Sequence, residues 1–104
     1  MNKYLDDQPD ELEAKLEAFE RETWDLAADP WNEEAGRWRR TLVARLQGSE
    51  LTLKAANAAM LYSGARGYVY AGAAQRRLRE AYFVAIVTPA TKQLRKMLAD
   101  LDAA

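Results

Sequence analysis

The chain has 104 residues, a formal net charge of −1, and neither cysteine nor histidine. This length predicts one domain with a single core. The missing residue types exclude disulfides, thiolate and imidazole metal sites, Cys–His nucleophile pairs and Ser–His–Asp triads, and with them most hydrolase chemistry.

Hydropathy predicts no membrane association. No apolar run approaches the ~20 residues that cross a bilayer. The acidic N-terminus also lacks the basic and apolar regions of a signal peptide. We therefore expect a cytoplasmic protein.

The two signs of charge are separated along the chain. Residues 1–34 hold twelve acidic and three basic residues, a net charge of −9, whereas residues 35–104 hold twelve basic and four acidic residues, a net charge of +8. This separation predicts attraction between the N-terminal segment and the remainder, within one chain or between chains.

Residues 1–8 are predicted to be a flexible N-terminus, and residues 9–104 a single helical domain. Pro9 suits the first position of a helix, and Asp29-Pro30 ends it, since the residue before proline disfavours helical geometry. Between them, apolar residues recur every three to four positions and predict one buried seam. The seam consists of Leu12, Leu16, Phe19, Thr23 and Leu26.

Glu13, Glu17 and Glu20 share one face of this first helix. Di-metal carboxylate bundles have such glutamates, but they pair them with histidine one turn away. Because this chain has no histidine, we expect a solvated acidic face and no metal site.

Asn32 is the predicted N-cap of the second helix, which runs to Gly64. Its inward stripe comprises Trp38, Leu42, Leu46, Leu53, Ala56 and Met60. Small residues in its second half allow a neighbouring helix to approach closely. Four arginines on its other faces are expected to pair with the acidic first helix: Arg37, Arg39, Arg40 and Arg45. A nucleic-acid patch is the alternative for these arginines, but the chain is not basic overall, so no nucleic-acid partner is expected.

Three of the five glycines fall within the stretch 63–72. Glycine adopts positive φ angles without steric cost and lets a flat ligand approach the backbone closely. Two interpretations remain open. Gly64 is either the C-cap of a helix before a simple reversal, or part of a ligand site.

After this turn, residues 73–82 predict a short helix that carries Arg76, Arg77 and Arg79. Residues 82–87 are apolar and predict buried helix or a connector, because no partner strand exists elsewhere. Thr88 and Pro89 are the predicted N-cap and first residue of a last helix that extends to about Asp102. Four amphipathic helices predict an all-α fold, an antiparallel four-helix bundle.

The run from Gly64 to Arg95 resembles the C-terminal helical domain of the flavin-dependent acyl-CoA dehydrogenases. That family has a GGxGY block, an ERxxRDA block and an IYEGTxxIQR block, in this order. Here Gly64-Ala65-Arg66-Gly67-Tyr68 resembles the first, Arg76 and Arg79-Glu80-Ala81 the second, and residues 86–95 the third. The resemblance covers residues 34–100. It implies a bundle of the acyl-CoA dehydrogenase type, with Gly64, Ala65, Arg66 and Gly67 close to FAD. It also implies an arginine pattern that supports the bundle or a subunit interface, for which a solvated basic face is the alternative.

The chain departs from the family at the residues that do chemistry. Thr88 occupies the position of the glutamate that removes the substrate's α-proton in many members, and a threonine hydroxyl cannot act as that base. Leu61, Ala90 and Lys92 replace residues that reach flavin. The resemblance therefore suggests the scaffold without its catalytic base.

Two functions follow as expectations. The first is the C-terminal domain or small subunit of an acyl-CoA dehydrogenase-like flavoprotein oxidoreductase, active only with missing domains or a partner that supplies the base. FAD is then expected through assembly and not in the isolated chain. The second is a non-catalytic helical assembly or scaffold module that has lost flavin. Both predict a homo-oligomer or a flavoprotein partner subunit.

Overall fold

The chain is entirely helical in the part that the computed structural model describes, residues 1–69 and 72–104. The α-helices are α1 (Pro9–Ala28), α2 (Arg37–Ser63), α3 (Ala73–Ile86) and α4 (Thr91–Ala103). Two 3-10 segments, η1 (Asn2–Tyr4) and η2 (Gly64–Tyr68), precede α1 and follow α2. The predicted all-α fold is confirmed. Tyr70 and Ala71 of the predicted glycine turn lie outside the described residues.

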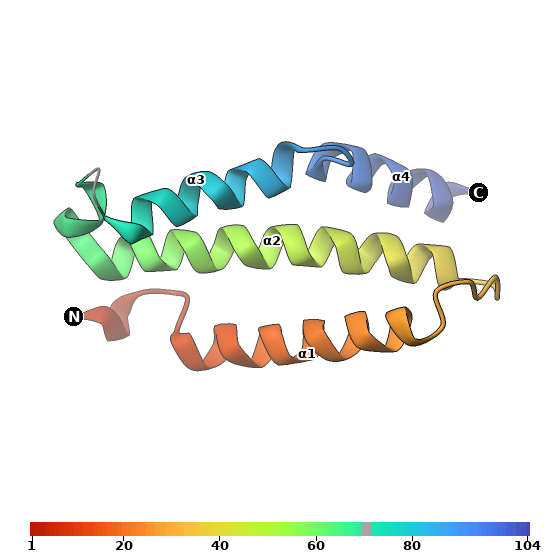
Figure 1. Cartoon of the computed structure of the whole chain (residues 1–104), viewed down its shortest axis with the longest axis horizontal. Helices are drawn as coiled ribbons and strands as arrows, with labels where there is room; N and C mark the ends of the chain where they lie inside the picture. Colours follow the sequence, from red (N-terminus) through yellow and green to blue (C-terminus); the bar gives the residue numbers. More distant parts are fainter. Residues whose placement is uncertain (70–71) are drawn as a thin grey trace.

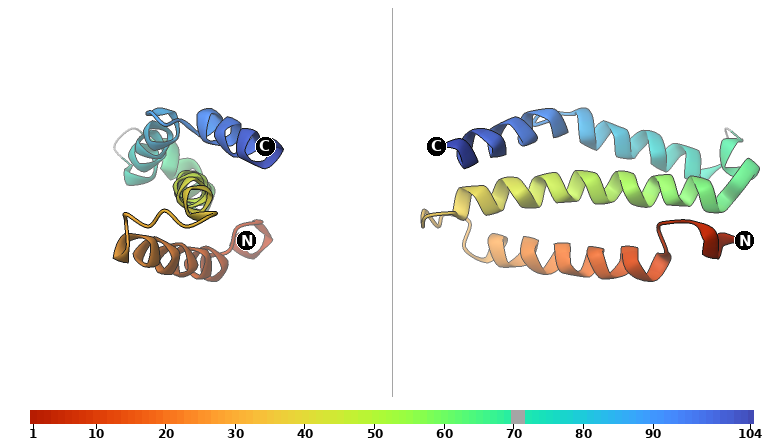
Figure 2. Two further views of the ribbon diagram at one scale, coloured as in Figure 1. Left: turned by 90° about the vertical axis from the view of Figure 1, so that its right-hand side faces the viewer. Right: turned by 180° about the vertical axis from the view of Figure 1, so that it is seen from behind.

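Helix α2 is the central element, and the other three helices pack on it (Figure 1). Helix α1 runs antiparallel to α2 along one side, and α3 and α4 follow each other along the other side, so the four helices form three rows. Seen end-on, α1 and the α3–α4 row lie on opposite sides of α2 (Figure 2). The molecule measures 48 by 25 by 24 Å, and its radius of gyration is 16.1 Å. A compact domain of this length would have a radius of about 13 Å, so this one is elongated.

The core is thin and follows α2. Among the described residues, the buried apolar side chains are two leucines and six alanines: Leu42, Ala44, Ala56, Ala58, Ala81, Ala85, Ala90 and Leu94. Helix α1 contributes no buried residue. The predicted stripe of the second helix is confirmed at Leu42 and Ala56, but Trp38 is 56% exposed, so its predicted burial is wrong.

Polar contacts hold α1 near its C-terminal end. Arg40 donates hydrogen bonds to Glu22 at 2.9 Å and to Asp25 at 2.8 Å. Arg37 donates to the carbonyl oxygens of Leu26 and Asp29, at 2.6 and 2.7 Å. These carbonyls lie where α1 ends, and the last carbonyls of a helix lack partners within it. The predicted pairing between the arginines and the acidic helix is thus confirmed for Arg40.

At the N-terminal end of α1, contacts of Asp7 attach the residues before this helix to α2. Lys54 forms an ion pair with Asp7 at 3.3 Å, and the Tyr62 hydroxyl donates to the Asp7 carbonyl at 3.1 Å. Midway along α1, the Phe19 ring packs on Gly48, where a Cβ would lie 3.0 Å from the ring. A small residue at position 48 therefore lets the two helices approach.

Two helix starts differ from the prediction. Helix α2 begins at Arg37, after Gly36 at φ 82°, and not after Asn32. Asn32 instead accepts a hydrogen bond from the Glu34 amide at 2.8 Å, which stabilises a turn in the loop. Helix α4 begins at Thr91, so Thr88 and Pro89 are not its cap and first residue. The Gln93 side chain accepts from the Ala90 amide at 2.8 Å and so stabilises this later start.

Helix α3 extends further than predicted, to Ile86. Its last turns are helical, as one of the two alternatives held, but only Ala85 of residues 82–87 is buried. Tyr82, Phe83 and Ile86 are 50%, 62% and 68% exposed. These three apolar side chains therefore lie on the surface of α3 and not in the core.

Candidate functional site

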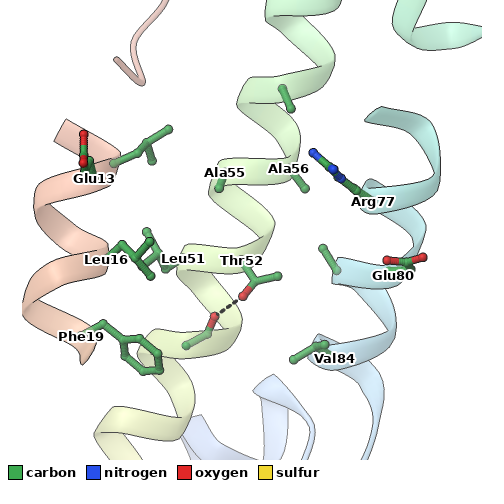
Figure 3. A pocket seen from close by; sticks show the side chains of 14 residues that line it. Glu13, Leu16, Phe19, Leu51, Thr52, Ala55, Ala56, Arg77, Glu80 and Val84 are labelled. Atoms are coloured by element: carbon green, nitrogen blue, oxygen red, sulfur yellow. Dashed lines mark hydrogen bonds between the residues drawn. The ribbon is translucent and has the colours of Figure 1, made fainter. Parts of the chain in front are cut away.

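A groove of about 810 Å³ lies over α2, between α1 and α3 (Figure 3). The α1 wall consists of Leu12, Glu13, Leu16 and Phe19. The floor consists of Gly48, Leu51, Thr52, Ala55, Ala56 and Ala59 from α2. The α3 wall consists of Arg77, Glu80, Ala81 and Val84. Three helices thus contribute to one open, elongated site.

The groove is apolar because of what each helix presents to it. Most floor residues are glycine or alanine, with Leu51 next to Leu16 of the α1 wall, whereas the walls carry the larger side chains Leu16, Phe19 and Val84 (Figure 3). Thr52, the polar residue of the floor, donates its hydroxyl hydrogen bond to the Gly48 carbonyl of its own helix at 2.7 Å. With that hydroxyl satisfied, the floor is suited to contact apolar side chains.

Three charged residues line the groove: Glu13 on the α1 wall, and Arg77 and Glu80 on the α3 wall. Glu13 belongs to α1 and Arg77 to α3, both are exposed, and they lie at a similar level along the groove (Figure 3). Neither forms an ion pair with any described residue. Elsewhere on these helices, Glu22 and Asp25 of α1 pair with Arg40 of α2, which lowers the pKa of Asp25, and Arg76 of α3 pairs with Glu80.

The four residues implied to lie near flavin are in η2, at one end of the molecule. Gly64 caps α2 with φ 60°, and a Cβ on it would meet nothing within 4 Å. Its predicted role as C-cap is confirmed. Ala65 and Arg66 are exposed, whereas Gly67 is buried, and a Cβ there would lie 3.0 Å from the Ser63 Cβ. The absence of a side chain at Gly67 is thus explained by packing within the chain.

Thr88 lies at the opposite end of α3 from this corner (Figure 1). The 14 residues of α3 separate them, a rise of about 21 Å at 1.5 Å per residue. The structure therefore does not bring Thr88 together with Gly64–Gly67 in one chain.

The three arginines of α3 have different surroundings. Arg76 pairs with Glu80 at 3.4 Å, and Arg79 donates to the Gln75 side chain at 3.0 Å. Both are exposed on α3, whereas Arg77 lines the groove. In the second helix, Arg39 pairs with Asp102 of α4 rather than with α1, so its predicted partner is wrong. Arg45 likewise contacts α3 instead of α1.

The acidic face of α1 forms no metal centre in the part of the chain that the structure describes. Glu13, Glu17 and Glu20 are all exposed, and no group of three potential ligands is close enough to hold an ion there. No described helix has the length and apolar character needed to cross a membrane.

Comparison with protein-family models, with the curated proteins and with the solved structures finds no match. The groove is therefore characterised by its own residues. Sequence reasoning placed a close helix contact on the small residues of α2 but missed that Ala55, Ala56 and Ala59 form the floor of a groove. Two signals pointed to it: those small residues, and the opposite charges of the first and third helices.

Proposed function

We propose that this chain is a helical assembly module whose groove receives a helical surface of another polypeptide. The observation that carries the proposal is the groove itself, with an apolar floor and walls from three helices. Extended apolar surfaces on a folded chain are commonly interaction sites. The thin core agrees with this, since α1 buries no residue in the isolated chain.

A further helical surface in the groove would complete a bundle. Helices with small residues at the contact can pack closely, and a bundle buries the apolar stripes of its members. Under this proposal the predicted antiparallel four-helix bundle is reached only in the assembly. The scaffold interpretation of the sequence is thus the one that the groove favours.

The test uses a variant that fills the groove. Ala55→Trp places an indole on its floor, and Asn57→Trp adds the same side chain to an exposed position of α2 outside the groove. We expect the dye 8-anilinonaphthalene-1-sulfonate to bind the dilute wild-type chain and Asn57→Trp equally, and to bind Ala55→Trp at least several-fold more weakly. Circular dichroism checks that both variants remain helical. Equal dye binding by all three chains would contradict the proposal.

The flavoprotein interpretation is a second candidate. It is supported by the resemblance and by the exposed corner at Gly64, Ala65 and Arg66, where a ligand can reach the backbone. The separation of Thr88 from this corner means that one flavin site would need different copies or a partner subunit to contribute. Its substrate would be an acyl thioester, and the base would come from another chain.

Colour tests this candidate. The chain is purified together with its partner subunit, and the flavin absorption band is recorded. Stoichiometric FAD that is lost in Arg66→Glu and retained in Arg21→Glu, at an exposed arginine of α1, would support a site at the corner. FAD content that is unchanged in Arg66→Glu would contradict it.

A further inference from the structure

We infer that the occupant of the groove is a second copy of this chain, related by a twofold axis that runs parallel to the helices. In this dimer, Glu13 of each copy pairs with Arg77 of the other. The inference rests on the proposed function, because it names the partner that the groove receives.

The two walls of the groove carry opposite charge. Helix α1 holds seven acidic and two basic residues, and α3 holds three arginines and one glutamate. At the groove itself, α1 presents Glu13, and α3 presents Arg77 together with Glu80. The Glu80 carboxylate pairs with Arg76 of its own helix. Glu13 and Arg77 have charges without an ion-pair partner among the described residues. A surface with this division of charge is complementary to itself after the correct rotation.

Symmetry limits how two copies can stack groove to groove. A twofold axis perpendicular to the helices places α1 on α1 and α3 on α3, so charges of the same sign face each other. An axis parallel to the helices places α1 of each copy on α3 of the other, so opposite charges meet. Since a twofold interface uses the same surface of both copies, the charge pattern selects the parallel axis.

The parallel axis also keeps each residue at its own level along the groove. Residues that face each other across the groove in one chain therefore face each other between copies. Figure 3 shows Glu13 at the level of Arg77, Leu16 at the level of Glu80, and Phe19 at the level of Val84. The rotation thus brings together one charged pair and one apolar pair on each side of the axis, and it places Leu16 beside Glu80, whose carboxylate is paired with Arg76 of its own chain.

The outline of the molecule sets an upper limit on the area that a dimer can bury. A face of the molecule measures 48 by 25 Å, which is on the order of 1,000 Å², and a standard interface buries about 800 Å² of each partner.

Charge reversal tests the pairing on the full chain. We expect Glu13→Arg and Arg77→Glu each to weaken self-association in sedimentation equilibrium by about tenfold, since each places two like-charged pairs in the dimer. An equal mixture of the two variants should recover wild-type affinity, because a mixed dimer contains only opposite-charge pairs. The double variant should recover it as well. The controls Glu11→Arg and Arg79→Glu change charge on the same helices outside the groove, and they should leave affinity within about twofold.

A cysteine pair provides a second readout that does not depend on affinity. The chain has no cysteine, so a mixture of Glu13→Cys and Arg77→Cys chains is expected to form a mixed disulfide dimer on oxidation, in preference to either variant alone. Crosslinking within the Glu13→Cys chains alone would indicate the perpendicular axis and overturn the inference.

The outcomes separate this inference from the proposed function. A wild-type chain that stays monomeric at all concentrations, while Ala55→Trp still removes dye binding, would overturn the second copy and leave an assembly face for another protein. The inference would also be overturned by a dimer whose affinity is unchanged by Glu13→Arg and by Arg77→Glu and that forms no mixed disulfide. If in addition the dye does not distinguish Ala55→Trp, the proposed function fails as well.

Discussion

The contact between Arg45 and Ser49 gives the sharpest prediction about stability. Arg45 donates one hydrogen bond to the Ser49 hydroxyl, one turn further along α2, and another to the Val84 carbonyl of α3 at 3.2 Å. Ser49 has 0% exposure. The Val84 carbonyl lies in the last turn of α3, where carbonyls lack helical partners. One guanidinium thus satisfies a buried hydroxyl and a helix end.

The expected magnitudes follow from these contacts. A hydrogen bond from a charged donor contributes about 1.5–3 kcal/mol, and an ordinary one about 1 kcal/mol. Arg45→Met keeps the apolar stem and removes both bonds, so the free energy of unfolding should fall by about 3 kcal/mol. Ser49→Ala should cost about 1 kcal/mol. The double variant should lose less than the two losses added together, because they share one bond.

Urea unfolding monitored by circular dichroism measures all three free energies. The matched control is Arg79→Met, at an exposed arginine of α3 whose partner is the Gln75 side chain. It should change the free energy of unfolding by about 0.5 kcal/mol or less. An Arg45→Met chain as stable as this control, or strictly additive losses in the double variant, would refute the account of the contact.

Three further predictions concern the fold. Leu94→Ala, at the fully buried leucine of α4, should cost about 2–5 kcal/mol in urea unfolding, and a loss below about 1 kcal/mol would show that α4 is loosely packed. Gly64→Ala should cost about 1–3 kcal/mol, because φ 60° with ψ −142° is a glycine conformation; a loss no larger than that of Ala65→Gly would contradict this. Arginines lower the pKa of Asp25 and Asp102 below the usual 3.8. The two ion pairs therefore stabilise the folded chain above that value, and this stabilisation is lost as the pH falls through the lowered pKa values. The urea concentration at the unfolding midpoint should decrease as the pH drops below about 4, and it should decrease less steeply in Asp102→Asn. Equal slopes in the two chains would contradict the assignment.

The helical class and the first helix could be predicted because their signals are local. Pro9 starts α1 and Asp29-Pro30 follows it, and the helix spans Pro9–Ala28. The start of α2 could not be predicted from residue type. Asn32 caps either a helix or a turn, and only its hydrogen bond with Glu34 decides between them.

Burial was harder to predict than helix, because it depends on which neighbours are present. Trp38, Phe83 and Ile86 are apolar, yet no element in residues 1–69 or 72–104 covers them. The same holds for the groove, whose floor residues looked like a helix contact in the sequence. The small residues of α2 predict close packing with a neighbouring helix, and the positive charge on α3 predicts attraction to the acidic first helix. Which helix surface remains exposed, however, depends on how α1, α2 and the α3–α4 row are arranged in space.

The most direct test of the central claim, that the groove is an assembly surface, is the reactivity of a single thiol on its floor. In Ala55→Cys, the only thiol in the chain, labelling by a maleimide should be fast at low protein concentration and slow at high concentration, whereas Asn57→Cys should react at one rate throughout. Equal reactivity of the two thiols at every concentration, and with any added partner, would contradict the claim.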